Sequence, residues 1–312
     1  MANFLSNFDM VSFLFSTIRV MTPLLFASMA CLVFTKGGID SIATEGIMLM
    51  CALAGTVGAH IFSNAWLGLL FGMLVGILLS CVFGYATLTL KANPVLAGIA
   101  LNILAGGLTI FILYFITGEK GSSQSLASPV LPTLKIPGLH SIPVLGKILS
   151  EHNVLTYISL LVVAALQFFF FKTKAGLRIR AVGENPHAAE SVGLSIMKYK
   201  YLTLMIAGAL AGMGGSFMSM GYVSFFSRNM IAGRGFIGMA AESMGHGMPG
   251  GVLLSTLLFS VADALSVRLQ MMNMPPELMQ LLPYLVTIVA IAIYSYQLEK
   301  KREKQRMLSG SK

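Results

Sequence analysis

The sequence has few charged residues: Asp, Glu, Lys and Arg make up 11% of its 312 positions, against about 25% in a typical soluble domain. Most of its surface therefore cannot face water. Uncharged stretches long enough to cross a bilayer core of about 30 Å recur, for example at residues 65–90 and 154–171. They lack the polar stripe that a surface helix of a soluble protein carries. The composition predicts an integral membrane protein.

The motifs of several enzyme classes are absent as well. The phosphate-cradling pattern G-x-x-x-x-G-K-[ST] does not occur, and its nearest approach, residues 138–147, has the wrong glycine spacing. Neither a paired His/Glu zinc signature nor a G-x-S-x-G elbow is found. Cys31, Cys51 and Cys81 lie in apolar stretches and match no metal-site spacing. We expect no cofactor, no metal site and no enzyme activity in this chain.

What the sequence does contain is a series of apolar segments. We predict a single all-α membrane domain over residues 1–312, a polytopic bundle of about 8–10 transmembrane segments with one or two broken or re-entrant helices. A helix over residues 235–245 would span only about half a bilayer, and a Gly/Pro-rich break follows it. Non-helical backbone within a membrane must be buried in protein or line a cavity, as at the pathways of transporters. The apolar segments cover residues 11–34, 45–61, 65–90, 94–117, 154–171, 199–222, 235–245, 250–269 and 278–296.

The net charge of +9 is concentrated in two stretches. Residues 172–200 and 298–312 together hold twelve of the 21 Lys and Arg residues. Loops rich in Lys and Arg stay in the cytoplasm, so we place the loop and the tail there. The polar, Pro- and Gly-containing linker 118–153 is then external. The same charge attracts anionic lipid, and we expect no nucleic-acid partner. If the segment after Glu45 crosses the membrane fully, the N-terminus lies outside; if that segment is re-entrant, the N-terminus lies inside.

Small residues recur every fourth position in two of the apolar segments. Such a ridge lets the backbone of a neighbouring helix approach closely. We therefore expect a tightly packed bundle. The two ridges consist of Gly68, Gly72, Gly76, Ser80 and Gly84, and of Gly208, Gly212 and Ser216.

The basic loop contains a short segment with clear helix start and stop signals. Asn185 suits the N-cap, Pro186 the first helical position and Gly193 the residue after the end. A helix of about two turns does not persist alone in water and is usually held by a partner. We predict that it is a docking element.

This segment resembles the cytoplasmic coupling loop of permease subunits of ABC importers, in the branched-chain amino acid and ribose permease superfamily. The resemblance is greatest to the nucleoside and simple-sugar permeases. Three further runs carry it: NMIAGRGFIGMAA at 229–241, AGIALNILAGGLT at 97–109 and GGIDSIATEGIML at 37–49. In the loop, the matching residues are Arg180, Ala181, Gly183, Asn185, Pro186, Ala188, Ala189 and Gly193.

The resemblance implies an assembly in the inner (plasma) membrane of a bacterium or archaeon. Cytosolic ABC ATPase subunits would bind ATP and Mg²⁺, a second permease chain, identical or related, would complete the pathway, and an external solute-binding protein would deliver a nucleoside or simple sugar. Residues expected to couple the permease to the ATPases are Gly183, Glu184, Asn185, Pro186, Ala188, Ala189 and Gly193. The alternative is a stand-alone secondary transporter driven by an ion gradient.

Polar residues inside a membrane are unfavourable there and often functional. On that ground we name five candidates for the translocation pathway. Glu242 could instead pair with an arginine on a neighbouring helix, and Asp263 and Arg268 are interpreted as structural or interfacial. The pathway candidates are Asp40, Glu45, Asn102, Glu242 and His246.

Overall fold

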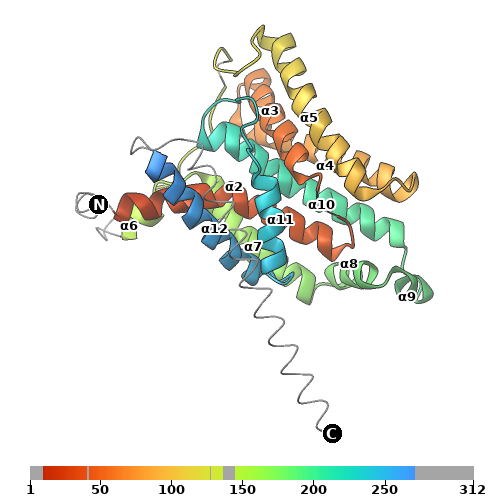
Figure 1. Cartoon of the computed structure of the whole chain (residues 1–312). Coiled ribbons are helices and arrows are strands. Elements are labelled where there is room, and N and C mark those ends of the chain that lie inside the picture. The colour runs from red at the N-terminus through yellow and green to blue at the C-terminus, as the bar shows by residue number, and fades with distance from the viewer. Residues whose placement is uncertain (1–9, 41, 127, 136–144, 271–312) are drawn as a thin grey trace.

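The computed structural model of the chain describes residues 10–270, except for 41, 127 and 136–144, and it is helical almost throughout (Figure 1). Two isolated β-bridges, Ser122 with Ser227 and Thr133 with Asn153, are the extended pairings among the described residues. The helices are α2 (Met10–Lys36), α3 (Thr44–Phe62), α4 (Ala65–Gly84), η1 (Tyr85–Thr89), α5 (Pro94–Thr117), α6 (Leu145–Leu149), α7 (Val154–Lys172), α8 (Lys174–Glu184), α9 (Pro186–Ser191), α10 (Ile196–Phe217), η3 (Met218–Tyr222), α11 (Arg234–Met244) and α12 (Pro249–Gln270).

Seven of these helices are long and apolar enough to cross a membrane. They are α2, α3, α5, α7 and α12, together with α4 and α10, each continued by one π-helical turn. The predicted all-α membrane bundle is therefore confirmed. The expected segment 278–296 and the basic tail 298–312 lie outside the described residues.

The centre of the bundle is formed by α2, α3 and α10, with α4 packed against α3 and α10. The two small-residue ridges meet face to face. A Cβ on Gly76 would collide with the carbonyl oxygen of Gly208, and a Cβ on Gly208 with that of Gly76. Ser216 of the second ridge likewise fills the space beside Gly72. The ridges thus hold two helices in backbone contact, as predicted.

The outward faces of α4 and α5 are apolar. Nothing in the part of the chain that the structure describes covers their large side chains, which in water would be an aggregation hazard but is what a lipid-facing surface requires. Examples are Leu74 (62%), Leu96 (67%), Ile103 (71%), Phe111 (65%) and Phe115 (82%).

Contacts at the two ends of α2 fix its direction. Near its start, the ring of Phe15 stacks on His152 of the linker that we predict to be external, with 4.2 Å between ring centroids. At its end, the carbonyl of Lys36 lies against Gly183 of the loop that we predict to be cytoplasmic. Given that sidedness, α2 starts outside, and α3 is a full crossing.

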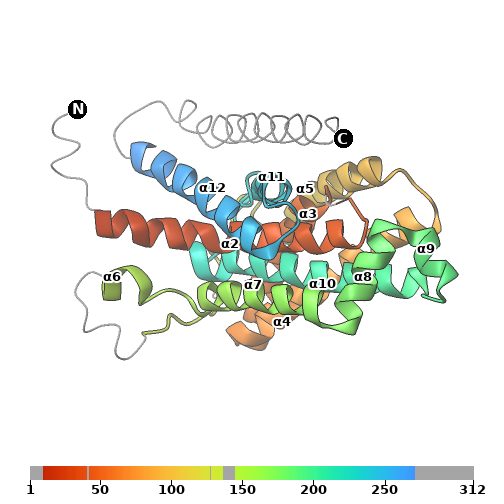
Figure 2. The same cartoon turned by 90° about the horizontal axis from the view of Figure 1, so that it is seen from below.

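Helix α11 lies across the long helices rather than along them. Figure 2 shows it end-on, whereas α2, α7 and α10 are seen from the side. The break after it is confirmed, since α11 ends at Met244 and α12 begins at Pro249. We expected residues 235–245 to follow the bundle axis through half of the bilayer, and this direction is wrong. Gly238 packs directly on Ala27 and Ser28, and this contact lets α11 cross the middle of α2 closely.

Candidate functional site

The basic loop folds into two consecutive helices. The hydroxyl oxygen of Thr173 accepts a hydrogen bond from the Gly176 N–H (3.1 Å) and caps α8. Asn185 ends α8 and begins α9, where its side-chain oxygen accepts from the Ala188 N–H (3.0 Å). Gly193 has the left-handed conformation (φ 80°) that suits the residue beyond a helix end. The short helix predicted after Asn185 is confirmed; α8 before it was not foreseen.

Helix α9 presents one face to water and one to the protein. Ala188 of α9 is exposed, as are Glu184 at the end of α8 and, at 75%, Val192 just after α9. Ala189 is buried (4%) and fixes α9 to the rest of the chain. The two adjacent alanines that sequence reasoning grouped together therefore lie on different faces. Only Ala188 is available to a partner.

The loop touches the bundle at the end of α2. A Cβ on Gly183 would collide with the carbonyl oxygen of Lys36 and lie 2.9 Å from the nitrogen of Gly38. Gly38 itself has a left-handed conformation (φ 66°), which favours glycine. This backbone contact joins α8 to the linker 37–43, which leads into α3.

Asn102 of α5 holds that linker to the start of α3. Its side-chain oxygen accepts a hydrogen bond from the Gly46 N–H (2.8 Å), and its amide group donates to the carbonyl of Ile42 (2.9 Å). The first bond satisfies an N–H at the α3 N-terminus that has no partner within the helix. Asn102 thus acts as a cap supplied by another helix.

Glu45 does the same for α11. One carboxylate oxygen accepts from the Gly233 N–H (2.8 Å) and the other from the Gly235 N–H (2.7 Å). A carboxylate is favoured at a helix N-terminus because it meets both the free N–H groups and the positive end of the helix dipole. Close approach is possible because Gly235 lacks a Cβ, which would lie 2.6 Å from the Glu45 nitrogen. We call Glu45, Asn102 and the backbone groups that they bind the α3 junction.

The remaining pathway candidates lie apart from the α3 junction. Glu242 is 7% exposed and hydrogen-bonds the side chain of Thr35, with the Lys36 charge nearby. Asp40 and His246 are exposed, in the linker before α3 and in the turn after α11. Five residues predicted as one group therefore occupy several places in the chain.

Arg234 pairs with Asp263 of α12, at 3.4 Å between the guanidinium nitrogen and the carboxylate oxygen. Their side chains are 15% and 17% exposed. This agrees with a structural interpretation of Asp263. Arg234 also donates to the Ile231 carbonyl (3.1 Å), so it helps to hold the chain just before α11.

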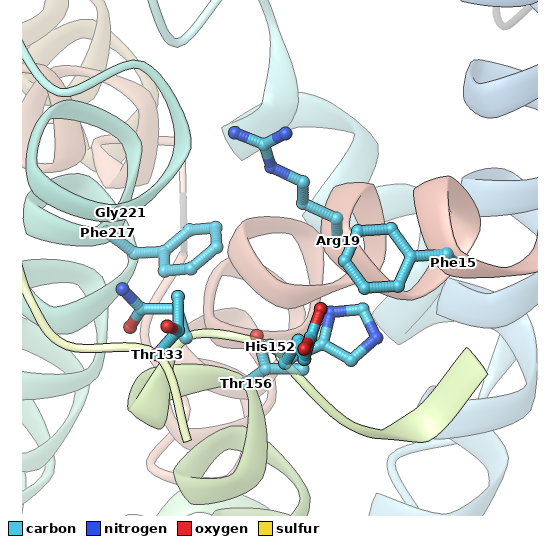
Figure 3. Close-up of a pocket in the computed structure, with 9 residues that line it drawn as sticks. Phe15, Arg19, Thr133, His152, Thr156, Phe217 and Gly221 are labelled. Carbon is cyan, nitrogen blue, oxygen red and sulfur yellow. The ribbon is translucent and has the colours of Figure 1, made fainter. Parts of the chain in front are cut away.

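Sequence reasoning missed a cavity of about 230 Å³ at the other end of α2 (Figure 3). Phe15 and Arg19 of α2, His152 and Thr156 around the start of α7, and Phe217 of α10 line it. Phe15 and Arg19 are four residues apart, so they share a helix face, but nothing in the sequence indicates which segments cover it. Among the described residues no group of three or more His, Cys, Asp or Glu side chains is placed to hold a metal.

Comparison with known proteins gives consistent matches over most of the chain. Residues 13–291 match the family described as "Branched-chain amino acid transport system / permease component". The nucleoside ABC transporter permease protein NupC of Lactococcus lactis is 34% identical, over 88% of this chain and 89% of that protein. The guanosine ABC transporter permease protein NupQ of Bacillus subtilis has the same identity and coverage.

A third relative is named for a sugar. The putative glucose ABC transporter permease protein TsgC13 of Haloferax volcanii is 30% identical over 92% of both chains. Among solved structures, a chain of PsaBC from Streptococcus pneumoniae in complex with Fab superposes with a TM-score of 0.53, at 14% identity and 93% coverage of both chains. At that identity the likeness concerns the fold alone.

Proposed function

The chain belongs to the family of permease components of branched-chain amino acid transport systems, and we propose that it is a membrane-spanning subunit of an ATP-driven importer for nucleosides. The proposed substrate class is inferred from the 34% identity, across nearly the whole chain, to permeases named for nucleosides and for guanosine. A stand-alone secondary transporter is disfavoured, because these relatives are subunits of ABC transporters.

The energy for transport comes from partner chains. The sequence holds no phosphate-cradling motif, so ATP and Mg²⁺ bind to cytosolic ATPase subunits. A second permease chain completes the pathway, and an external solute-binding protein delivers the nucleoside. The exposed apolar faces of α4 and α5 supply the surface that lipid contacts.

The ATPases dock on α9. Ala188 is small and exposed, and Glu184 and Val192 flank it on the accessible side of the loop. A small residue at the centre of a docking surface lets the partner approach closely, whereas a long charged side chain would hold it away. Ala189, Asn185, Pro186 and Gly193 keep α9 folded and in place.

Movement of the docked loop reaches the bundle through backbone contacts. Gly183 bears directly on the end of α2 and on Gly38, so α8 cannot shift without displacing the linker 37–43. The α3 junction ties this linker to α5 through Asn102 and to α11 through Glu45. In this account Glu45 and Asn102 position helices instead of contacting the solute.

A monosaccharide is the second candidate solute, because one relative is named as a putative glucose permease. Reconstitution of the chain in proteoliposomes with its partner ATPases, second permease and solute-binding protein separates the two. We expect ATP-dependent uptake of radiolabelled adenosine or guanosine that unlabelled nucleoside abolishes and glucose does not. Uptake of glucose in preference to nucleosides would refute the substrate class.

A further inference from the structure

The cavity beside Phe15 is separate from the α3 junction and from the coupling loop. Four parts of the chain line it: the first turns of α2, the linker at Thr133 and at residues 151–153, the start of α7, and the end of α10 with its π-helical turn at Gly221. It lies on the side of the bundle that we predict to be external. A solute released by an external binding protein would therefore meet this end first.

Aromatic rings form its walls. Phe15 and His152 stack with nearly parallel planes, 16° apart and 4.2 Å between centroids. Figure 3 shows Phe217 on the other side of the cavity from Phe15. Phe217 is 1% exposed and His152 3%, so the face left for a ligand is that of the half-buried Phe15, against which a flat ring can lie in an offset stack.

The charged side chains at the cavity already have partners. Arg19 donates to the Tyr222 carbonyl (2.5 Å) and lies over the Tyr222 ring. Glu151 forms an ion pair with Lys135 (3.4 Å). The cavity is lined by one cation, Arg19, and one anion, Glu151, whose charges offset each other, so its lining has no net charge that would select an ion. The cavity therefore suits an uncharged molecule.

Uncharged polar side chains lie beside the aromatic rings and can form hydrogen bonds with a ligand. Thr133 and Asn153 border the cavity, and Nε2 of His152 hydrogen-bonds the Ile148 carbonyl (2.8 Å), so that Nδ1 is the acceptor whenever the ring is neutral. The volume of about 230 Å³ lies below the roughly 300–1,000 Å³ of drug-sized sites and fits one ring system.

The backbone around the cavity is irregular in two places. The last turn of α10 is π-helical and carries Gly221 into the wall, and Glu151 has a left-handed conformation (φ 69°) although it is not glycine. Such turns and such φ values are enriched at ligand-binding sites.

We propose that this cavity is a binding site for the base of the transported nucleoside, which lies against the Phe15 ring while Phe217 closes the opposite wall. The proposal rests on the proposed function, because the solute class is taken from there. It assigns base recognition to the permease itself, in addition to any recognition by the solute-binding protein.

Equilibrium binding of radiolabelled adenosine to the assembled permease–ATPase complex, without the solute-binding protein, tests the proposal. The variants are Phe217→Leu and Phe15→Leu, which keep apolar bulk and remove the π-face. Phe115→Leu, on the exposed face of α5, is the matched control. Because Phe15 is only half-buried, its variant remains informative if Phe217→Leu fails to assemble.

We expect saturable adenosine binding to the unmodified complex, competition by adenine, and none by ribose. Phe15→Leu should weaken binding by roughly 5- to 150-fold, the range given by base–aromatic stacking, Phe217→Leu should weaken it by changing the opposite wall, and Phe115→Leu should not. Absence of saturable binding, equal competition by ribose, or unchanged affinity in both variants would overturn the proposal. Nucleoside uptake by the complete system distinguishes failure of the cavity site from failure of the proposed function. If any of these results is obtained while the complete system still takes up nucleosides, only the cavity site is refuted. If the complete system takes up no nucleoside, the proposed function is refuted as well.

Discussion

Replacement of Glu45 by Gln should loosen the N-terminus of α11. The carboxylate accepts from two backbone N–H groups, Gly233 at 2.8 Å and Gly235 at 2.7 Å. A glutamine offers one acceptor oxygen, and its NH₂ group would face the other N–H. One donor therefore loses its partner, which costs about 1–3 kcal/mol when the group is buried.

The loss of this free energy should appear as faster amide hydrogen exchange at the start of α11. If the amides at the start of α11 exchange through local opening, a loss of about 1–3 kcal/mol accelerates their exchange by roughly 5- to 150-fold. Hydrogen–deuterium exchange with mass spectrometry on the detergent-solubilised complex measures this for peptides covering residues 230–244. Glu184→Gln, an exposed glutamate of the coupling loop, is the control. Unchanged exchange in Glu45→Gln would refute the capping role and with it the link from α3 to α11.

Three further predictions concern other parts of the chain. Gly183→Ala should abolish transport, because its Cβ would collide with the end of α2, whereas Gly250→Ala, with open space around it, should transport normally; uptake assays compare the two. Asp263→Leu should destabilise the protein by about 2–4 kcal/mol by leaving Arg234 mostly buried without its partner, and adding Arg234→Met should restore much of the loss in thermal unfolding; equal losses in the single and double variants would contradict this. Burial lowers the pKa of His152, so the unfolded chain binds the proton more readily and stability should fall as the pH drops below about 6.5. His152→Gln should flatten that pH dependence of the melting temperature, and an unchanged profile would contradict the assignment.

Local signals in the sequence were sufficient for much of the fold. Hydropathy located the crossings that the structure describes, and the cap residues Asn185 and Gly193 marked α9 correctly. The spacing of Gly76 and Gly208 within their ridges predicted backbone contact between helices. Each of these features depends on residues within a few turns of one another, so one sequence suffices.

The partners of the buried polar residues could not be predicted in this way. Glu45 binds backbone groups 188 and 190 residues away, and Asn102 binds groups 56 and 60 residues away. A polar residue in a membrane segment looks the same whether it caps a neighbouring helix or lines a pathway. The direction of α11 was missed for a related reason, since helix length says nothing about the angle at which a helix crosses its neighbours.

The central claim, that α9 transmits the action of partner ATPases, is tested most directly by Ala188→Arg in the reconstituted importer. Ala92→Arg provides the control, because Ala92 is exposed in the short connection before α5, on the side that we predict to be cytoplasmic. We predict that Ala188→Arg inserts normally and loses ATP-dependent nucleoside uptake, while Ala92→Arg retains it. Full ATP-dependent uptake by Ala188→Arg would contradict the account.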